Sequence, residues 1–323
     1  MGDEAKKWFS AAPAFDPADG TTVIEPPGTV TGYWAGALSA VYDDSAGEFY
    51  LYYRVRRPIG KGRGWQCHIA RSTDGLHFST VWTATKEQFG SESFEGGALV
   101  RAPDGGFRLY ASYLDATDRR WKIALLEAAT PGEFDPESRR VVLSGEDADS
   151  EGVKDPCVAI VDGRYHMFVN YAPRWLIPPG ATEEELHDAG NVFATKYGGS
   201  SGLATSADGV HFEWKGDVLR PGGHWDRLLT RVDTVVHRPP LFAVFYSGRG
   251  RVEETYEDRT GIAVSLDLEV LHKISDERPV LASPHSSGAL RYMDAVPVGN
   301  EIFYYYEYAR PDGAHEIRLS KTP

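Results

Sequence analysis

The feature that most constrains the fold is a nine-residue pattern that occurs twice. ARSTDGLHF at 70–78 and ATSADGVHF at 204–212 share the sequence A-x-S-x-D-G-x-H-F. Asp-Gly between two short apolar runs is typical of a tight turn that joins antiparallel strands. Weaker copies occur as IALLEA at 123–128, IAVSLD at 262–267 and EIRLSK at 316–321. Five copies predict five repeats of one structural unit.

Each copy follows an aromatic segment, and each aromatic segment follows one of smaller residues across a polar turn. Short runs rich in Val, Ile, Tyr and Phe, separated by Gly, Asp and Pro, are typical of strands. Each unit is therefore predicted to contain strands A, B and C, and usually a fourth strand D. The aromatic B strands are EFYLYYR at 48–54, FRLYASY at 107–113, YHMFVNY at 165–171, LFAVFYS at 241–247 and IFYYYEY at 302–308.

Five repeats of four antiparallel strands predict an all-β fold, a five-bladed β-propeller with its blades around a central axis. One domain, 1–323, is expected, with the segment 23–30 completing the last blade. Residues 173–202 contain a helix-like TEEELHDA and are expected to form an insertion over one face. The five blades are expected at about 34–84, 94–144, 151–220, 225–281 and 290–322.

Composition limits the partners. The formal charge is −13, which disfavours binding to nucleic acid or to an anionic membrane and leaves a small-molecule or oligosaccharide partner. No apolar run is long enough to cross a membrane, so a cytoplasmic location is expected. Cys67 and Cys157 lie in apolar runs, and no histidine pair has metal-ligand spacing. Neither a metal nor a cofactor is expected, and the oligomeric state is left open.

Carboxylates stand at the starts of four A strands, in the order Glu95, Asp155, Asp233 and Asp294. The first unit has Gly36 or Ala37 there instead. Acids gathered around one axis repel one another, so their pKa values should be raised or each acid should be paired with a cation. The cations available are Lys154, Arg231, Arg291 and Arg54.

A single acid before a strand often only caps a turn. The recurrence of the acids beside cations favours a catalytic site formed by Asp155, Asp233, Glu95 and Asp294. Polar B-strand ends and aromatic loop residues at the same end of the unit suit a sugar substrate, whose C–H faces stack on aromatic rings. The predicted substrate-binding residues are Arg54, Glu307, Asn170, Trp34, Trp175 and Arg231.

DGRYHMFVNY, ATSADGVHF and the strand-initial KDP resemble the five-bladed propellers of glycoside hydrolase family 43, with relatives in families 32 and 130. The resemblance covers nearly the whole chain. It implies an axial active site in which three strand-initial carboxylates act as base or nucleophile, as general acid, and as a tuning acid. By position, Asp155 matches the tuning acid and Asp233 matches the general acid, where the family has Glu. The family's blade 1 Asp has no counterpart here.

The expected function is therefore that of a glycosidase-like enzyme, with Asp233 or Glu95 as proton donor and an ionised partner activating water. Glu95 or Asp294 would take the role of the missing base. Phosphorolysis is the first alternative, with phosphate held by Arg54, Arg56 and Lys61. The second is a propeller that does not hydrolyse, and instead binds a sugar or modifies a small metabolite.

Overall fold

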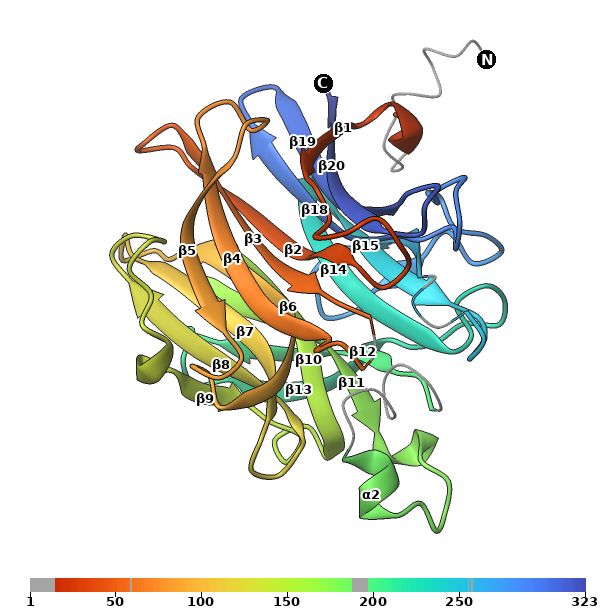
Figure 1. Ribbon diagram of the computed structural model, residues 1–323. Helices are drawn as coiled ribbons and strands as arrows, with labels where there is room; N and C mark the ends of the chain where they lie inside the picture. Colours follow the sequence, from red (N-terminus) through yellow and green to blue (C-terminus); the bar gives the residue numbers. More distant parts are fainter. Residues whose placement is uncertain (1–14, 59, 188–196, 255, 257) are drawn as a thin grey trace.

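The computed structural model describes residues 15–58, 60–187, 197–254, 256 and 258–323. Almost all of its regular structure is β-strand, grouped in antiparallel sheets around a central axis (Figure 1). The innermost strands contact one another in a closed ring, β2 with β6, β6 with β10, β10 with β14, β14 with β18, and β18 with β2. The predicted five-bladed propeller is confirmed.

The strands follow the expected order A to D within each blade. Blade 1 consists of β2 (Trp34–Asp43), β3 (Glu48–Arg56), β4 (Gly64–Ser72) and β5 (Ser79–Thr85). Blade 2 consists of β6 (Ser91–Arg101), β7 (Phe107–Asp115), β8 (Trp121–Ala128) and β9 (Arg140–Leu143). Blade 3 consists of β10 (Ser150–Val161), β11 (Arg164–Pro173), β12 (Ser200–Ser206) and β13 (Glu213–Leu219).

The named strands of blade 4 span 229–273, and Leu281, at the end of the expected 225–281, forms an isolated β-bridge with Thr260. Blade 4 consists of β14 (Leu229–Arg238), β15 (Leu241–Arg249), β16 (Arg259–Ser265) and β17 (His272–Lys273). Blade 5 consists of β18 (Leu290–Val298), β19 (Glu301–Ala309), β20 (His315–Thr322) and the N-terminal β1 (Thr21–Ile24).

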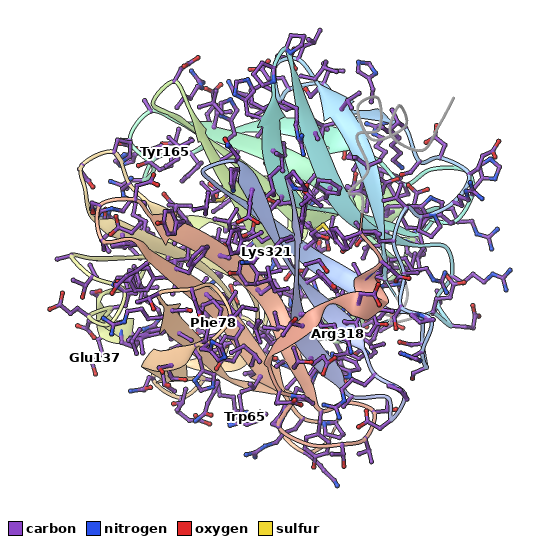
Figure 2. All side chains as sticks on the ribbon, turned by 90° about the horizontal axis from the view of Figure 1, so that it is seen from above. Trp65, Phe78, Glu137, Tyr165, Arg318 and Lys321 are labelled. Carbon is purple, nitrogen blue, oxygen red and sulfur yellow. The ribbon has the colours of Figure 1, made fainter. Side chains whose placement is uncertain are left out.

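The N-terminal strand closes the ring by pairing antiparallel with β20. It occupies residues 21–24 and not the expected 23–30, because the Pro-Pro-Gly sequence that follows Glu25 cannot continue a ladder of hydrogen bonds. Arg318, which projects from β20 (Figure 2), donates a 2.8 Å hydrogen bond to the carbonyl of Ala18. The last blade is thus fastened by residues from both ends of the chain.

The nine-residue pattern forms a turn that the neighbouring blade holds in place. Gly75 and Gly209 adopt φ values of 73° and 73°, in the left-handed region that favours glycine. The Tyr305 hydroxyl donates to the carbonyl of Gly75 at 2.9 Å, and the Tyr110 hydroxyl to that of Gly209 at 2.8 Å. Each tyrosine belongs to the B strand of the preceding blade.

Blade 4 shows why its copy of the pattern is weaker. Leu268 takes the place of the glycine, with φ 65°. The preceding B strand has Phe168 at the position of Tyr110 and Tyr305, as the strand pairings show. Phenylalanine has no hydroxyl to donate to the turn. The two complete copies of the pattern are thus the ones whose glycine carbonyl accepts a hydrogen bond from a tyrosine of the neighbouring blade. All three aromatic rings are fully buried between blades.

The insertion follows β11 and projects beyond the strand ends (Figure 1). It contains η3 (Arg174–Leu176) and the one-turn helix α2 (Glu183–Leu186). Thr182 and Glu185 form a reciprocal capping box at the start of α2. Of the helix-like segment expected at 182–189, residues 183–186 are helical, and the last two residues lie outside the described residues. Among the described residues, no helix is long and apolar enough to cross a membrane.

Candidate functional site

All five innermost strands are irregular near their starts. The register against strand B shifts between Gly36 and Ser39, and at the equivalent place in each of the other blades. The second residue of the irregular segment has a left-handed backbone in three blades, with φ of 52° at Ala37, 54° at Asp155 and 50° at Tyr292. Such bulges redirect side chains and are common beside active sites.

The bulge is supported by the preceding blade, through one B-strand position. The N–H of Asp155 donates to Ser112 Oγ at 2.6 Å, and the N–H of Tyr292 donates to Ser247 Oγ at 3.2 Å. In blade 1 the N–H of Ala37 donates to Glu307 Oε2 at 3.0 Å. An acceptor side chain from a neighbouring blade thus stabilises a backbone conformation that non-glycine residues seldom adopt.

The strand register corrects one prediction. Gly36, Lys154, Arg231 and Arg291 share the first bulge position, and each lies opposite the same position of its B strand. Glu95 shares that position, because it lies between Phe94, opposite Tyr113, and Gly97, opposite Ala111. Asp155, Asp233 and Asp294 occupy the second, third and fourth positions. The four carboxylates therefore lie at successive levels along the axis, and the expectation of one equivalent position is wrong.

Blade 1 has no carboxylate of its own because Glu307 occupies the space. A Cβ atom at Gly36 would overlap the Glu307 carboxylate. Glu307 is fully buried, and its Oε1 accepts hydrogen bonds from Arg291 Nη2 at 2.7 Å and from His315 Nδ1 at 2.7 Å. Burial alone would raise the pKa of Glu307, but Arg291 and His315 hold it well below its usual range. A side chain from blade 5 thus takes the blade 1 position.

Glu95 forms a buried ion pair with Arg54, 2.9 Å from Arg54 Nη2 to Glu95 Oε2. Burial favours the neutral acid, yet Arg54, with Lys154 and Arg56 nearby, holds the pKa of Glu95 well below its usual range. Glu95 is therefore ionised throughout the neutral and mildly acidic pH range.

Asp258, directly before β16, joins three arginines. It lies 2.8 Å from Arg249 Nη1, 3.4 Å from Arg231 Nη1 and 3.5 Å from Arg291 Nη1. Burial opposes ionisation, but the three guanidinium groups together hold the pKa of Asp258 well below its usual range. One buried carboxylate thus connects the cations of blades 4 and 5.

Asp233 differs from Glu95 and Asp258. Burial raises its pKa to about 6, although Arg231 Nε, 3.1 Å from its Oδ1, and the Ser247 hydroxyl both favour the ionised form. Asp155 lies on the other side of the same arginine, with its Oδ2 3.8 Å from Arg231 Nη1 and 3.8 Å from Lys154 Nζ. Its Oδ1 accepts from the Gly96 N–H at 2.8 Å, and its Oδ2 has no hydrogen-bond partner among the described residues.

Three cavities lie in sequence along the axis. The first, called here the arginine cavity, has a volume of about 20 Å³ and is lined by Arg54, Arg56, Glu95, Lys154, Asn170, Leu229, Arg231, Arg249, Tyr256, Asp258, Arg291 and Tyr292. The second, the aspartate cavity, has about 10 Å³ and contains both Asp155 and Asp233. The two share Arg231 and Tyr292 as walls.

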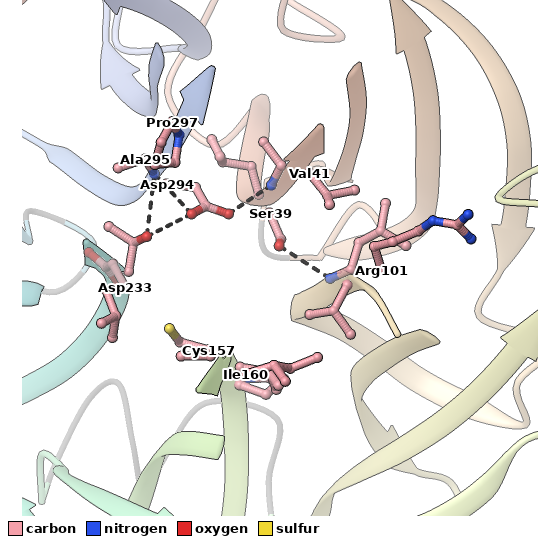
Figure 3. A pocket seen from close by; sticks show the side chains of 18 residues that line it. Ser39, Val41, Arg101, Cys157, Ile160, Asp233, Asp294, Ala295 and Pro297 are labelled. Carbon is pink, nitrogen blue, oxygen red and sulfur yellow. Dashed lines mark hydrogen bonds between the residues drawn. The ribbon is translucent and has the colours of Figure 1, made fainter. Parts of the chain in front are cut away.

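The third, the axial cavity, is much larger, at about 400 Å³ (Figure 3). It is lined mainly by apolar residues from the middle and the ends of the inner strands, and Asp233 is shared with the aspartate cavity. Asp294 lies here and not with Asp155. Its two oxygens accept from the Ala40 N–H at 2.7 Å and from the Thr234 hydroxyl at 2.7 Å, and burial raises its pKa.

The predicted binding residues fall into two groups. Arg54, Asn170 and Arg231 line the arginine cavity, and Glu307 lies directly behind Arg291. Trp34 is 3% exposed, so the prediction of an exposed stacking surface is wrong for this residue. Trp175 is 58% exposed but belongs to η3 and lines none of the three cavities.

Trp34 is buried because it belongs to a stack that covers the arginine cavity. Its ring stacks on His315 with centroids 4.5 Å apart, and the Arg56 guanidinium carbon lies 4.4 Å from the Trp34 ring. The same carbon lies 4.2 Å from the ring of Tyr256, in the segment between β15 and β16. Cation–π contacts of this kind hold the cover over the buried charges.

Sequence reasoning missed Asp258, Tyr292, Tyr256 and His315. Asp258 could have been predicted, since it is an acid directly before a C strand. The predicted catalytic acids, by contrast, all stand at the starts of A strands. Tyr292 stands beside Arg291 at the bulge, where its position depends on the register. Among the described residues, no group of three or more His, Cys, Asp or Glu side chains could hold a metal ion.

No protein-family model and no curated protein sequence matches the chain. Solved structures do match. A glycosyl hydrolase from Bacteroides ovatus is 15% identical with a TM-score of 0.66, covering 97% of this chain and 94% of that one. A thermostable family-43 glycoside hydrolase is 18% identical with a TM-score of 0.62, covering 93% and 92%.

A β-1,2-mannobiose phosphorylase from Listeria innocua, in complex with β-1,2-mannobiose, is also similar. It is 14% identical with a TM-score of 0.61, covering 93% of each chain. At these identities the likeness establishes the shared fold. Both a hydrolase and a phosphorylase of glycosides therefore have the propeller architecture of this chain.

Proposed function

We propose that the protein is a glycoside-cleaving enzyme whose reacting groups are Asp155 and Asp233. The observation that carries the proposal is that these two carboxylates line one cavity on the propeller axis and contact the same arginine, Arg231. A pKa of about 6 keeps a large fraction of Asp233 protonated in mildly acidic solution, as a general acid requires. Asp155 Oδ2 accepts no hydrogen bond from the described residues and faces two cations.

In the proposed reaction, Asp233 donates its proton to the leaving glycosidic oxygen and Asp155 accepts a proton from the attacking water. Arg231 lies between them and contacts both, so it positions the two carboxylates. Glu95 is a weak base because its ion pair with Arg54 lowers its pKa. Its proposed role is to hold Arg54 in place, and Asp294 is assigned to the axial cavity, away from the reacting pair.

Substrate entry in this proposal requires displacement of the cover formed by Trp34, Arg56 and Tyr256. The cover is held by stacking and cation–π contacts, which in such partly buried settings contribute on the order of 1 kcal/mol each. Binding energy from a sugar ring stacking on the same aromatic side chains would offset this cost. The residues predicted to bind sugar would thus act after the cover opens.

The experiment is a screen of aryl glycosides, with and without inorganic phosphate, on the wild-type protein and three variants. Asp233→Asn and Asp155→Asn should each lower kcat by at least about a hundredfold, as expected for loss of a general acid or base. Asp44→Asn is the matched control, because Asp44 is exposed in the β2–β3 turn. Equal turnover by all four proteins would refute the assignment of Asp155 and Asp233.

Phosphorolysis is the second candidate, because Arg54 and Arg56 lie next to the aspartate pair and would contact a phosphate once the cover is displaced. Lys61, expected to help hold phosphate, is exposed and does not line that cavity. A phosphate-dependent rate in the same screen would favour this candidate. Sugar binding without turnover on any glycoside would favour a non-hydrolytic propeller. The cytoplasmic location stays a prediction.

A further inference from the structure

The arginine cavity is lined by a cluster of buried cations. Six cationic side chains line it, namely Arg54, Arg56, Lys154, Arg231, Arg249 and Arg291. Five carboxylates of the described residues line the cavity or pair with those cations. They are Glu95, Asp155, Asp233, Asp258 and Glu307. Protonation of Asp233 removes one of these negative charges from the cluster.

His315 does not add to the positive charge of this cluster. His315 is buried against Glu307, and burial lowers its pKa, so it is neutral at neutral pH. All six cations are at most 7% exposed. Water therefore screens these buried charges poorly, so an anion bound among the cations would be strongly attracted to them.

Three guanidinium groups at the cavity have a nitrogen without a hydrogen-bond partner in the described part of the chain. The atoms are Arg54 Nη1, Arg56 Nε and Arg231 Nη2. Buried donors are almost always paired in native proteins, so three such donors around one cavity indicate a further acceptor, beyond those that the described residues provide. Guanidinium groups are also well suited to bind planar oxyanions.

The size of the cavity limits the acceptor. A volume of about 20 Å³ holds one or two water-sized groups. A halide ion or the two oxygens of a carboxylate fit that description, whereas the four oxygens of phosphate do not.

We infer that the arginine cavity binds one small monovalent anion, either a free ion such as a halide or the carboxylate group of an acidic sugar. The anion would accept hydrogen bonds from Arg54, Arg56 and Arg231. Because Arg231 also contacts Asp155 and Asp233, the bound anion would help to hold the arginine between the two carboxylates.

The direct test uses crystals of the full-length protein soaked in bromide. A peak in the anomalous difference map between Arg54, Arg56 and Arg231 is the expected result. A map with no bromide in the cavity, together with no binding in the solution measurements below, would overturn the inference. Neither measurement depends on turnover, so its outcome is independent of the proposed enzyme activity.

In solution, the melting temperature and the tryptophan fluorescence are followed during titration with bromide, chloride or formate. Gluconate, which is too large for the cavity, keeps the ionic strength constant. Saturable changes with the three small anions are expected. Arg56→Met should weaken the apparent affinity about tenfold or more, because it removes a charged hydrogen-bond donor. Arg71→Met is the control, since Arg71 is 52% exposed and pairs with Glu48.

Should Arg56→Met fail to fold, the wild-type titration and the bromide map still decide the question. Equal effects of small anions and gluconate would mean screening of surface charge and would overturn the inference. Tighter binding of phosphate than of any small anion would overturn it as well.

Competition with bromide identifies the source of the anion. Displacement by glucuronate but not by glucose, at concentrations that leave the ionic strength unchanged, assigns the cavity to the carboxylate of an acidic sugar. Displacement by chloride and formate alone assigns it to a free ion. Both results support the inference of a small-anion site.

Discussion

The role of Gly36 is open to a direct test, because a single methyl group should disrupt a buried ion-pair network. In Gly36→Ala the new Cβ overlaps the Glu307 carboxylate. Glu307 would have to leave its hydrogen bonds with the Ala37 N–H, Arg291 and His315, at 3.0, 2.7 and 2.7 Å. Breaking a buried ion pair costs about 3–5 kcal/mol.

We therefore expect Gly36→Ala to lower the free energy of unfolding by about 3–5 kcal/mol. For a chain of this size each kcal/mol corresponds to roughly 2–4 °C in melting temperature. The measurement is chemical denaturation followed by tryptophan fluorescence, with thermal unfolding as a second probe. Gly223→Ala is the control, because a Cβ at Gly223 meets no atom within 4 Å.

A double-mutant cycle separates the overlap from other causes. Glu307→Ala removes the carboxylate and destabilises the protein by itself. Since it also frees the space, adding Gly36→Ala to that background should cost less than about 1 kcal/mol. If Gly36→Ala is equally harmful in both backgrounds, or is harmless in the wild type, then Glu307 is not the reason for glycine in blade 1.

Three further predictions follow from the buried charges and the turn contacts. Burial raises the pKa of Asp233 from 3.8 to about 6, so the folded state binds more protons than the unfolded state between these values. Stability should therefore fall by about 2 kcal/mol as the pH rises from 4 to 7, and Asp233→Asn should abolish this step in a series of urea titrations. Arg54→Met should destabilise the protein by about 3–5 kcal/mol, because it leaves the buried Glu95 unpaired. Adding Glu95→Gln should restore part of this stability, and a double variant no more stable than Arg54→Met would contradict a direct ion-pair effect. Tyr110→Phe and Tyr305→Phe should each lower the free energy of unfolding by about 1 kcal/mol, because each removes a hydrogen bond to a turn carbonyl. Tyr33→Phe is the control and should be neutral in the same denaturation assay, because the Tyr33 side chain forms no hydrogen bond in the described structure.

The repeat and its strands could be predicted because their causes are local. An Asp-Gly turn, a B strand of alternating aromatic residues and a Gly-containing A strand each encode their own conformation over fewer than ten residues. Repetition of these segments then implied a ring of blades. The counter-ions could also be predicted, since each stands at a strand end close to a predicted carboxylate. They are Arg54, Arg231, Arg291 and Lys154.

The placement of the acids along the axis was decided only by the tertiary structure. A bulge shifts the register within each inner strand, and a shift of one residue changes the face and the level at which a side chain lies. Thus Glu95 lies in the arginine cavity, Asp155 and Asp233 in the next cavity, and Asp294 in the axial cavity. The strand-initial position alone could not distinguish them.

The amino-acid sequence by itself determined five repeats, the order of their strands and the identity of the charged residues near one end of the axis. Only the tertiary structure decided that Glu307 of blade 5 fills the place of a blade 1 acid, that Asp258 joins three arginines, and that Trp34 covers them. The physical reason is that local conformation depends on neighbouring residues in the chain. Pairing of buried charged and polar groups, by contrast, depends on distances between strands and blades that the chain brings together, in one case across 270 residues of sequence.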